Sequence, residues 1–198
     1  MATDIQQIIN NLLEFYNPYD KTVIIVGAGG GQFIEYETKA RQILAIDKDP
    51  EGLRQLKEKS VLLGLEDKFI FIQNDFYGCE ASGDLVMFEF CLHEMIDPEN
   101  AIRQAQTKAP EILIMDHWPG SEWAYFVDEV EKVANSWSAL KKFTLKKVKR
   151  YDTYQYFHDY DDILQKVKVQ GENSIKRIQN FKGKKDFRIH MSYGFVLI

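Results

Sequence analysis

The sequence has few of the residues that would place it outside the ordinary globular proteins. Its 198 residues include only two cysteines, Cys79 and Cys91, too few for a disulfide framework or a zinc site. No apolar run approaches the roughly 20 residues that cross a bilayer. The N-terminus, MATDIQQIINNLLEFYN, also lacks the basic start and the continuous apolar stretch of a signal peptide. We therefore expect a cytoplasmic protein that does not bind membranes.

The charge balance points away from nucleic acid. Lysine and arginine number 25 against 30 aspartates and glutamates, a net charge of -5, which disfavours general affinity for polyanions. One basic stretch, KKFTLKKVKR at Lys141–Arg150, is the exception. Most such runs form a solvated face or edge strand, and steering of an acidic substrate is the alternative. The composition, 45% hydrophobic and 28% charged, favours one packed domain over residues 1–198.

Short apolar runs alternate with helical patterns along the first two thirds of the chain. Helices are expected from a cap at Thr3, after Asp49-Pro50 with Leu53, Leu56, Ser60 and Leu63 inside, and over Pro98–Thr107. Strands are expected at Thr22–Val26, Ile43–Ile46, Phe69–Gln73, Leu85–Cys91 and Ile112–Met115. This alternation predicts an α/β fold with a doubly wound, open, mostly parallel sheet. Its ligands are expected beyond the carboxyl ends of the strands.

The last third has a different pattern. One helix is expected from Ser121 through Trp137. Asn173–Phe181 and Phe187–Ile198 are expected to form an antiparallel strand pair at one edge of the sheet, joined by a turn at Lys182–Lys185. The aromatic-rich segment 141–161 lies between these parts and is a candidate substrate-side insertion. Its aromatic residues from Tyr151 to Tyr160 suit either a lid over a small acceptor or a face packed on the sheet.

A glycine cluster and three acidic positions stand where ligands of such sheets bind. The segment VIIVGAGGG places Gly27, Gly29 and Gly31 directly after the first strand, where glycine allows a sharp turn and close approach of the backbone to a ligand. Asp47 follows the second strand, twenty residues after Gly27, where a carboxylate can accept both ribose hydroxyls. Asn74-Asp75-Phe76 ends the third strand, and Glu89 and then Leu92-His93-Glu94 end the fourth.

Together these motifs resemble the class I S-adenosylmethionine-dependent methyltransferases over about Lys21–Met115. The resemblance implies S-adenosylmethionine as cofactor and an antiparallel final strand. It implies a cofactor site made of Gly27, Ala28, Gly29 and Gly31 near the methionine part, Asp47 and Lys48 near ribose, and Asn74, Asp75 and Phe76 near adenine.

The family often carries an acid two residues before the first glycine, whereas this chain has Ile25 there. We expect Glu89 to take over the anchoring of the methionine amino group, because a carboxylate in an apolar strand is costly without a positive partner. The alternative is a Glu89 that is paired with a lysine or protonated in the core.

Two other functions fit the same sheet. A nicotinamide-dependent oxidoreductase uses the fingerprint GxGxxG, but its sixth position needs a small residue and this chain has Gln32. A non-catalytic module that binds a nucleoside ligand is the third reading, because fold and cofactor site alone do not establish turnover. The pattern therefore favours methyl transfer.

Methyl transfer from a sulfonium is an in-line displacement, so the protein aligns the acceptor and, where needed, removes its proton. The candidate catalytic residues are His93, Glu94, Asp116 and His117, which follow the fourth and fifth strands. His93 is expected to act as base or orienting group, and the alternative is a histidine that only caps the next helix. Trp118 and Trp123 suit either pocket lining or core packing. We expect a small-molecule acceptor rather than nucleic acid.

No metal is expected, although His93, Glu94, Asp116, His117 and His158 are ligand types. No closely spaced pair such as HxxxH fixes a coordination geometry, and adjacent residues on a loop seldom bind one ion together.

Overall fold

One seven-stranded sheet organises the molecule. The computed structural model describes residues 4–198, and its strand order is β3-β2-β1-β4-β5-β7-β6. The strands are β1 (Thr22–Val26), β2 (Gln42–Asp47), β3 (Phe69–Gln73), β4 (Leu85–Glu89), β5 (Glu111–His117), β6 (Lys147–Phe157) and β7 (Phe187–Leu197). β1 to β5 are parallel, and β7 runs antiparallel to both β5 and β6. The predicted α/β architecture with an antiparallel edge is confirmed.

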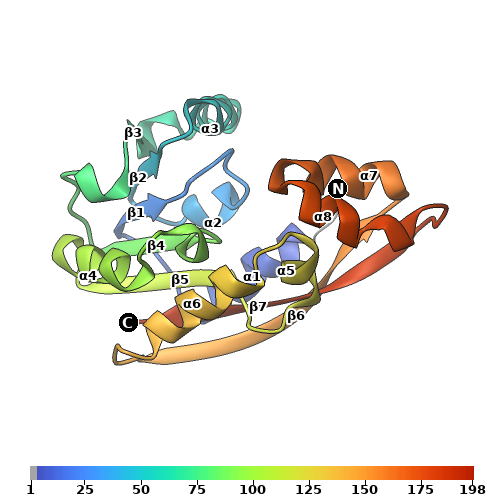
Figure 1. Cartoon of the computed structure of the whole chain (residues 1–198). Helices are drawn as coiled ribbons and strands as arrows, with labels where there is room; N and C mark the ends of the chain where they lie inside the picture. Colours follow the sequence, from blue (N-terminus) through green and yellow to red (C-terminus); the bar gives the residue numbers. More distant parts are fainter. Residues whose placement is uncertain (1–3) are drawn as a thin grey trace.

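Helices cover both faces of this sheet (Figure 1). They are α1 (Ile5–Phe15), α2 (Ile34–Glu37), α3 (Pro50–Leu62), α4 (Pro98–Lys108), α5 (Glu122–Phe126), α6 (Val130–Leu140), α7 (Tyr160–Val167) and α8 (Glu172–Arg177). Alternate residues of each strand enter opposite cores: Ile25 packs with α1, α2 and α3, while Ile24 packs with α4 and α6. This two-sided burial explains why β1 and β4 are continuous apolar runs. No helix within residues 4–198 is long and apolar enough to span a membrane.

The helix starts follow local capping chemistry. Asp49 and Asp97 accept backbone N–H groups at the starts of α3 and α4, and a proline occupies the first turn of each. At α1 the cap is Asp4, whose side chain accepts from Gln7 N, while the predicted cap Thr3 lies outside the described residues. Leu63 is 52% exposed, so its predicted place on the inner face of α3 is wrong.

The chain after β5 differs most from the predicted elements. The single helix expected after Ser121 is two helices, α5 and α6, separated by a turn in which Asp128 has φ +61°. The strand expected at Asn173–Phe181 is wrong, because this segment forms α8 and a 3-10 turn at Gln179–Phe181. The antiparallel partner of β7 is β6 instead.

β6 comes from the aromatic-rich segment that the sequence left unassigned. Lys147–Arg150 is exposed on this edge strand, so the basic stretch forms a solvated edge. Thr153, Gln155 and Phe157 point inward, and Tyr151 stacks on Tyr193 of β7 at 5.5 Å between ring centroids. Tyr151 and Phe157 therefore pack on the sheet, whereas Tyr156 is 48% exposed. Residues of α7 and of the turn before α8 line the cavity at the strand ends.

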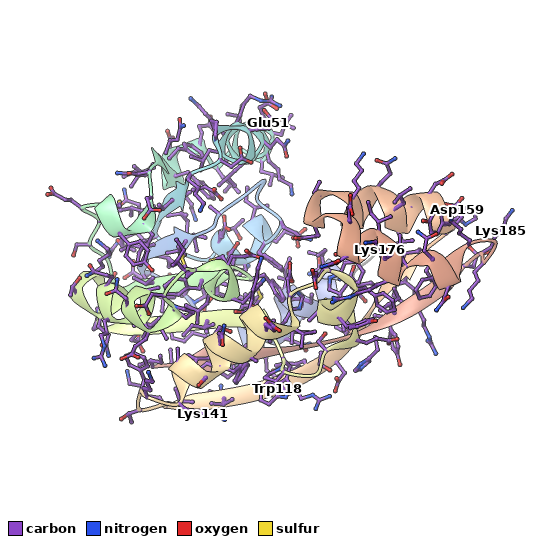
Figure 2. The ribbon with its side chains drawn as sticks, in the orientation of Figure 1. Glu51, Trp118, Lys141, Asp159, Lys176 and Lys185 are labelled. Atoms are coloured by element: carbon purple, nitrogen blue, oxygen red, sulfur yellow. The ribbon has the colours of Figure 1, made fainter. Side chains whose placement is uncertain are left out.

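β6 and β7 are each eleven residues long and extend beyond the shorter parallel strands. Figure 1 shows α7 and α8 seated over their far end, away from α3. In Figure 2, Asp159 and Lys185 mark that far end and Glu51 marks α3 on the opposite side.

Candidate active site

The glycine loop leaves β1 in a conformation that requires glycine. Gly27, Gly29 and Gly31 have φ of +72°, +47° and +68°. A Cβ at Gly27 would lie 2.7 Å from Cys91 Cβ, and one at Gly31 would lie 2.5 Å from Leu56 Cδ1. Both the positive φ angles and the lack of room for a Cβ therefore require glycine at Gly27 and Gly31.

Asp47 ties this loop to the start of α3. One carboxylate oxygen accepts Gly29 N at 2.8 Å, and the other accepts Asp49 N at 2.9 Å. The loop is also anchored to β2, since Gly27 N and Ala28 N donate to Ile46 O. Asp47 therefore orders the loop through its own bonds, a role that the sequence did not predict, and still lines the adjoining cavity.

A cavity of about 290 Å³ opens beyond the ends of β1, β2 and β4. The predicted cofactor residues that line it are Gly27, Asp47, Lys48, Asn74, Asp75, Phe76 and Glu89. Ala28, Gly29 and Gly31 are absent from its lining and shape the loop beside it. The lining residues that sequence reasoning missed include Phe90, Cys91 and Met95. Phe90 carries a structural signal, φ +47°, a strained value for an aromatic residue that often marks a functional site.

A second acid lies behind Glu89. The side chains of Glu89 and Glu37 are both buried, and Glu89 Oε1 and both oxygens of Glu37 accept no hydrogen bond from an N–H or hydroxyl donor. Burial raises the pKa of Glu37 to about 7. Burial, and then the charge of Glu37, raises the pKa of Glu89 well above its usual range. Burial therefore favours the protonated form of both carboxyl groups.

A second cavity, of about 450 Å³, adjoins the first through Phe90 and Glu94. His93, His117 and Glu129 supply its polar lining, and Trp123 and Val127 contribute apolar walls. Lys166 and Gln170 close it from the side of α7 and the following turn. Trp118 and Trp123 were candidates for either pocket lining or core packing. Trp123 lines the cavity, whereas Trp118 packs against Trp137 at 4.3 Å between ring centroids.

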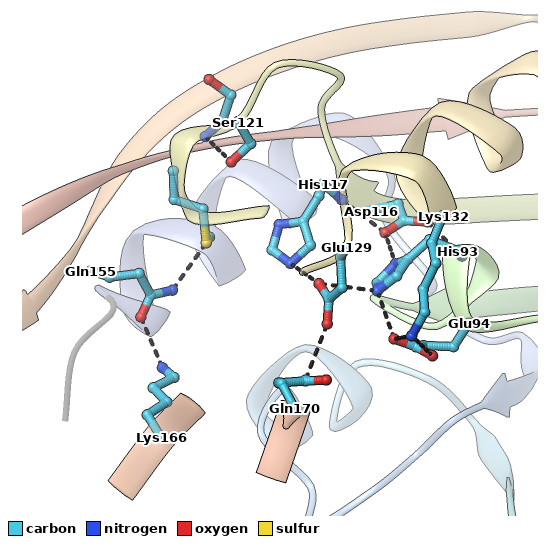
Figure 3. A network of polar contacts seen from close by, with 12 residues as sticks. His93, Glu94, Asp116, His117, Ser121, Glu129, Lys132, Gln155, Lys166 and Gln170 are labelled. Atoms are coloured by element: carbon cyan, nitrogen blue, oxygen red, sulfur yellow. Dashed lines mark hydrogen bonds and ion pairs between the residues drawn. The ribbon is translucent and has the colours of Figure 1, made fainter. Parts of the chain in front are cut away.

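A polar network connects the walls of this second cavity (Figure 3). Asp116 of β5 accepts the backbone N–H groups of His93, at 3.0 Å, and His117, at 2.8 Å, and contacts His93 Nδ1 at 2.5 Å. The other ring nitrogen of His93 lies 3.5 Å from Glu94 and 3.4 Å from Glu129. Three of the four predicted catalytic residues, all but the half-exposed Glu94, are buried.

Two further contacts hold the acids of this network. Lys132 of α6 contacts both oxygens of Glu94 at 2.7 and 2.9 Å, and Gln170 donates to Glu129 at 3.1 Å. Glu129, in the turn between α5 and α6, was not predicted. The sequence pattern predicted one continuous helix through this position. It therefore did not indicate the turn that brings Glu129 to the cavity.

The two histidines of the site differ in charge. Burial alone would lower the pKa of His93, but Asp116, then Glu129 and Glu94, raise it to about 11. Burial outweighs the nearby acids at His117 and lowers its pKa. This favours the orienting role of His93 over the role of proton-accepting base.

A wider hollow of about 840 Å³ lies between α1, α3 and α7. Its walls include Ile9, Leu62 and Leu63, and it has neither histidine nor the buried acids of the strand ends. We therefore place the chemistry in the two cavities beside Phe90.

The chain is similar in sequence and in fold to known methyltransferases. Residues 24–108 match the family model described as a methyltransferase domain. A proposed methyltransferase from Bacillus halodurans has a TM-score of 0.68 at 13% identity, over 98% of this chain and 97% of that one. A SAM-dependent methyltransferase from Aquifex aeolicus has a TM-score of 0.59 at 17% identity, over 100% and 90%. A proposed RNA methyltransferase from Pyrococcus horikoshii has a TM-score of 0.58 at 14% identity, over 97% and 83%.

No curated protein matches the chain. The solved structures establish the fold, and the matched segment contains the glycine loop and the acids that follow β2, β3 and β4. Residues 24–108 therefore match a methyltransferase domain, and the whole chain shares its fold with a SAM-dependent methyltransferase.

Proposed function

We propose that the chain transfers the methyl group of S-adenosylmethionine to a small-molecule acceptor held in the cavity beside His93. The observation that carries this proposal is the pair of adjoining cavities, which share Phe90 and Glu94 at the ends of the central strands. A volume of about 450 Å³ suits a small molecule, since ligand sites usually measure about 300–1,000 Å³.

The residues of the first cavity fit the cofactor. Glu89 Oε1 is buried, accepts no N–H or hydroxyl donor and faces this cavity, so the amino group of the cofactor would supply the cation that the acid lacks. Asp47 and Lys48 lie at the end of β2 beside the glycine loop, where the ribose would bind. Asn74, Asp75 and Phe76 offer polar edges and an aromatic face for adenine.

Bound S-adenosylmethionine supplies an electrophilic methyl group on a positively charged sulfur. The chain itself orients the acceptor and excludes water from the reacting atoms. Asp116 fixes His93 through both its backbone and its ring, so that the outer ring nitrogen points into the second cavity. Phe90 lies between the cavities and packs on His117 at 5.0 Å between ring centroids, forming a rigid apolar wall.

His117 is the second group placed to receive the acceptor. Its ring is buried and lines the cavity; Nδ1 has no hydrogen-bond partner among the described residues, and Nε2 lies 3.6 Å from Glu129. A buried ring nitrogen without a partner is costly, and a polar group on the acceptor would relieve that cost.

The experiment uses S-adenosylmethionine with a labelled methyl group and a cell extract separated into small molecules, RNA and protein. Label is expected in the small-molecule fraction. Label that appears only in RNA or in protein would overturn the acceptor class while leaving methyl transfer itself intact. A calorimetric titration is expected to show binding of S-adenosylmethionine and no measurable binding of nicotinamide dinucleotides.

A further inference from the structure

Three metal-ligand side chains converge in the acceptor cavity although they are far apart in the sequence. His93 and Glu94 follow β4, and Glu129 lies between α5 and α6. One donor atom from each lies within 4.8 Å of the others. His93 and Glu94 are ligand types already at the level of sequence, whereas Glu129 joins them only through the turn before α6.

The distances within this group suit metal ligands better than hydrogen bonds. His93 Nε2 carries at most one proton, yet it faces one oxygen of Glu94 at 3.5 Å and one of Glu129 at 3.4 Å. Both distances exceed the 2.7–3.2 Å of a good N–H···O bond. Donor atoms about 2.0–2.1 Å from a tetrahedral Zn²⁺ lie about 3.3–3.4 Å from one another.

The surroundings of the group also match those of a metal site. A metal-binding histidine usually donates its second ring N–H to a carboxylate, and His93 Nδ1 contacts Asp116 at 2.5 Å. Gln170 and Lys132 hold Glu129 and Glu94 in the same way. Each proposed ligand therefore has a partner that fixes its orientation.

The acids around His93 favour a positive charge, which the protonated ring supplies until a metal ion displaces the proton of its outer nitrogen. Asp116 and Glu129 are buried, Glu94 is half-exposed, and Lys132 is the lysine that contacts any of the three. Carboxylates out of water are costly unless they are paired or bind a metal. His117, 3.6 Å from Glu129, lies on the same side of the cavity with no hydrogen bond to its ring from residues 4–198.

We propose that His93, Glu94 and Glu129 bind one divalent transition-metal ion, with Zn²⁺ the ion that the two distances from His93 Nε2 fit. Three protein ligands leave a fourth position open, as in catalytic zinc sites, and this position faces the cavity that His117 lines. There the metal takes an oxygen or sulfur atom of the acceptor. This second part rests on the proposed function, whereas metal binding does not.

The test measures metal binding on the full chain without cofactor or acceptor. Protein stripped with a chelator and dialysed is titrated with ZnCl₂ by calorimetry, and Co²⁺ is added separately to record its visible spectrum. We expect one Zn²⁺ per chain with a dissociation constant in the micromolar range or tighter, and Co²⁺ absorption typical of a tetrahedral site.

Glu129→Gln keeps the size of the side chain and is expected to weaken Zn²⁺ binding by about tenfold to a hundredfold. Losses of this size are usual when a residue that hydrogen-bonds a metal ligand is removed. Glu94→Gln, at a half-exposed position that tolerates substitution, provides a second variant if the first fails to fold. Glu131→Gln, exposed on the same helix as Lys132, is the matched control and should bind as wild type.

Affinity within twofold of wild type in both Glu129→Gln and Glu94→Gln would overturn the proposal, and so would the absence of binding tighter than about 100 μM. Because no methyl transfer is measured, neither result depends on the acceptor class.

Discussion

The cofactor loop occupies five consecutive residues, Gly27–Gly31, whereas the acceptor cluster draws on residues from His93 to Gln170. The first region is built from backbone: its torsions, its close contacts and the N–H groups held by Asp47 define it. The second region is built from side chains that meet only after folding. The difference predicts that cofactor binding and acceptor chemistry depend on separate parts of one sheet edge. Four substitutions, with their controls, test that separation.

The largest effect is expected at the loop. In Gly27→Ala, the new Cβ lies 2.7 Å from Cys91 Cβ in a left-handed backbone, so strain and overpacking add to about 3 kcal/mol or more. Calorimetry should show S-adenosylmethionine affinity reduced by more than about a hundredfold.

Gly183→Ala separates the two causes of that loss. Gly183 has φ +78° but no atom within 4 Å of its Cβ position, so it carries the backbone strain alone. Its thermal stability should fall while cofactor affinity stays unchanged. Equal affinity losses in the two variants would show that close packing at Gly27 is unimportant.

The acceptor side is tested by His93→Ala. Turnover should fall by about a hundredfold, the usual contribution of a positioned polar group, while cofactor affinity stays within about threefold. His158→Ala is the control, because His158 is exposed and bonds Asp186 far from the cavity. Parallel loss of affinity and turnover would contradict the separation of the two regions.

The buried acids of the cofactor side predict a pH dependence of stability. The pKa of Glu37 is about 7 in the folded state, above the roughly 4.3 of an unfolded glutamate. Between these values the folded state holds a proton that the unfolded state has lost. The contribution to stability is therefore complete below about pH 4.3 and is lost as pH rises through 7.

Glu37→Gln removes this group, so without cofactor the variant should match wild type near pH 5 and exceed it by about 2–3 kcal/mol at pH 8. Urea unfolding at both pH values measures this. Glu35 is exposed on the same helix, so Glu35→Gln should keep the pH dependence of the wild-type free energy of unfolding. If the free energy of unfolding changed equally with pH in wild type, Glu37→Gln and Glu35→Gln, Glu37 would already be ionised in the folded protein.

The smallest effect is expected at Asp47. Asp47→Ala removes hydrogen bonds to a charged acceptor and loosens the glycine loop, so cofactor affinity should fall by about 2 kcal/mol, roughly thirtyfold. The fold should persist, because Asp47 lies at the rim of the sheet. Calorimetry and circular dichroism measure the two quantities, and unchanged affinity would refute the role given to Asp47.

The sequence was most informative where structure is local. β1 and β3 have the bounds that their apolar runs predict, and Asp49-Pro50 starts α3 as capping chemistry requires. It failed at Asn173–Phe181, whose β-like apolar spacing is overridden by packing into α8 and its following turn. The same limit applies to the site: Glu129 and Phe90 acquire their positions from a turn and a strained torsion, which periodicity does not encode.

The position of Asp116 has a consequence for the order of folding. β5 lies between β4, its parallel neighbour at Glu89↔Met115, and β7, its antiparallel neighbour at Asp116↔Gly194. A slip of one residue in either pairing would turn Asp116 to the opposite face of the sheet and release both histidines. During synthesis β4 ends about a hundred residues before β7 begins, so the nascent chain makes its glycine loop long before β5 gains its second neighbour. Contacts so distant in sequence close slowly, so we expect the pairing of β5 with β7, which fixes the register of Asp116, to form late in folding.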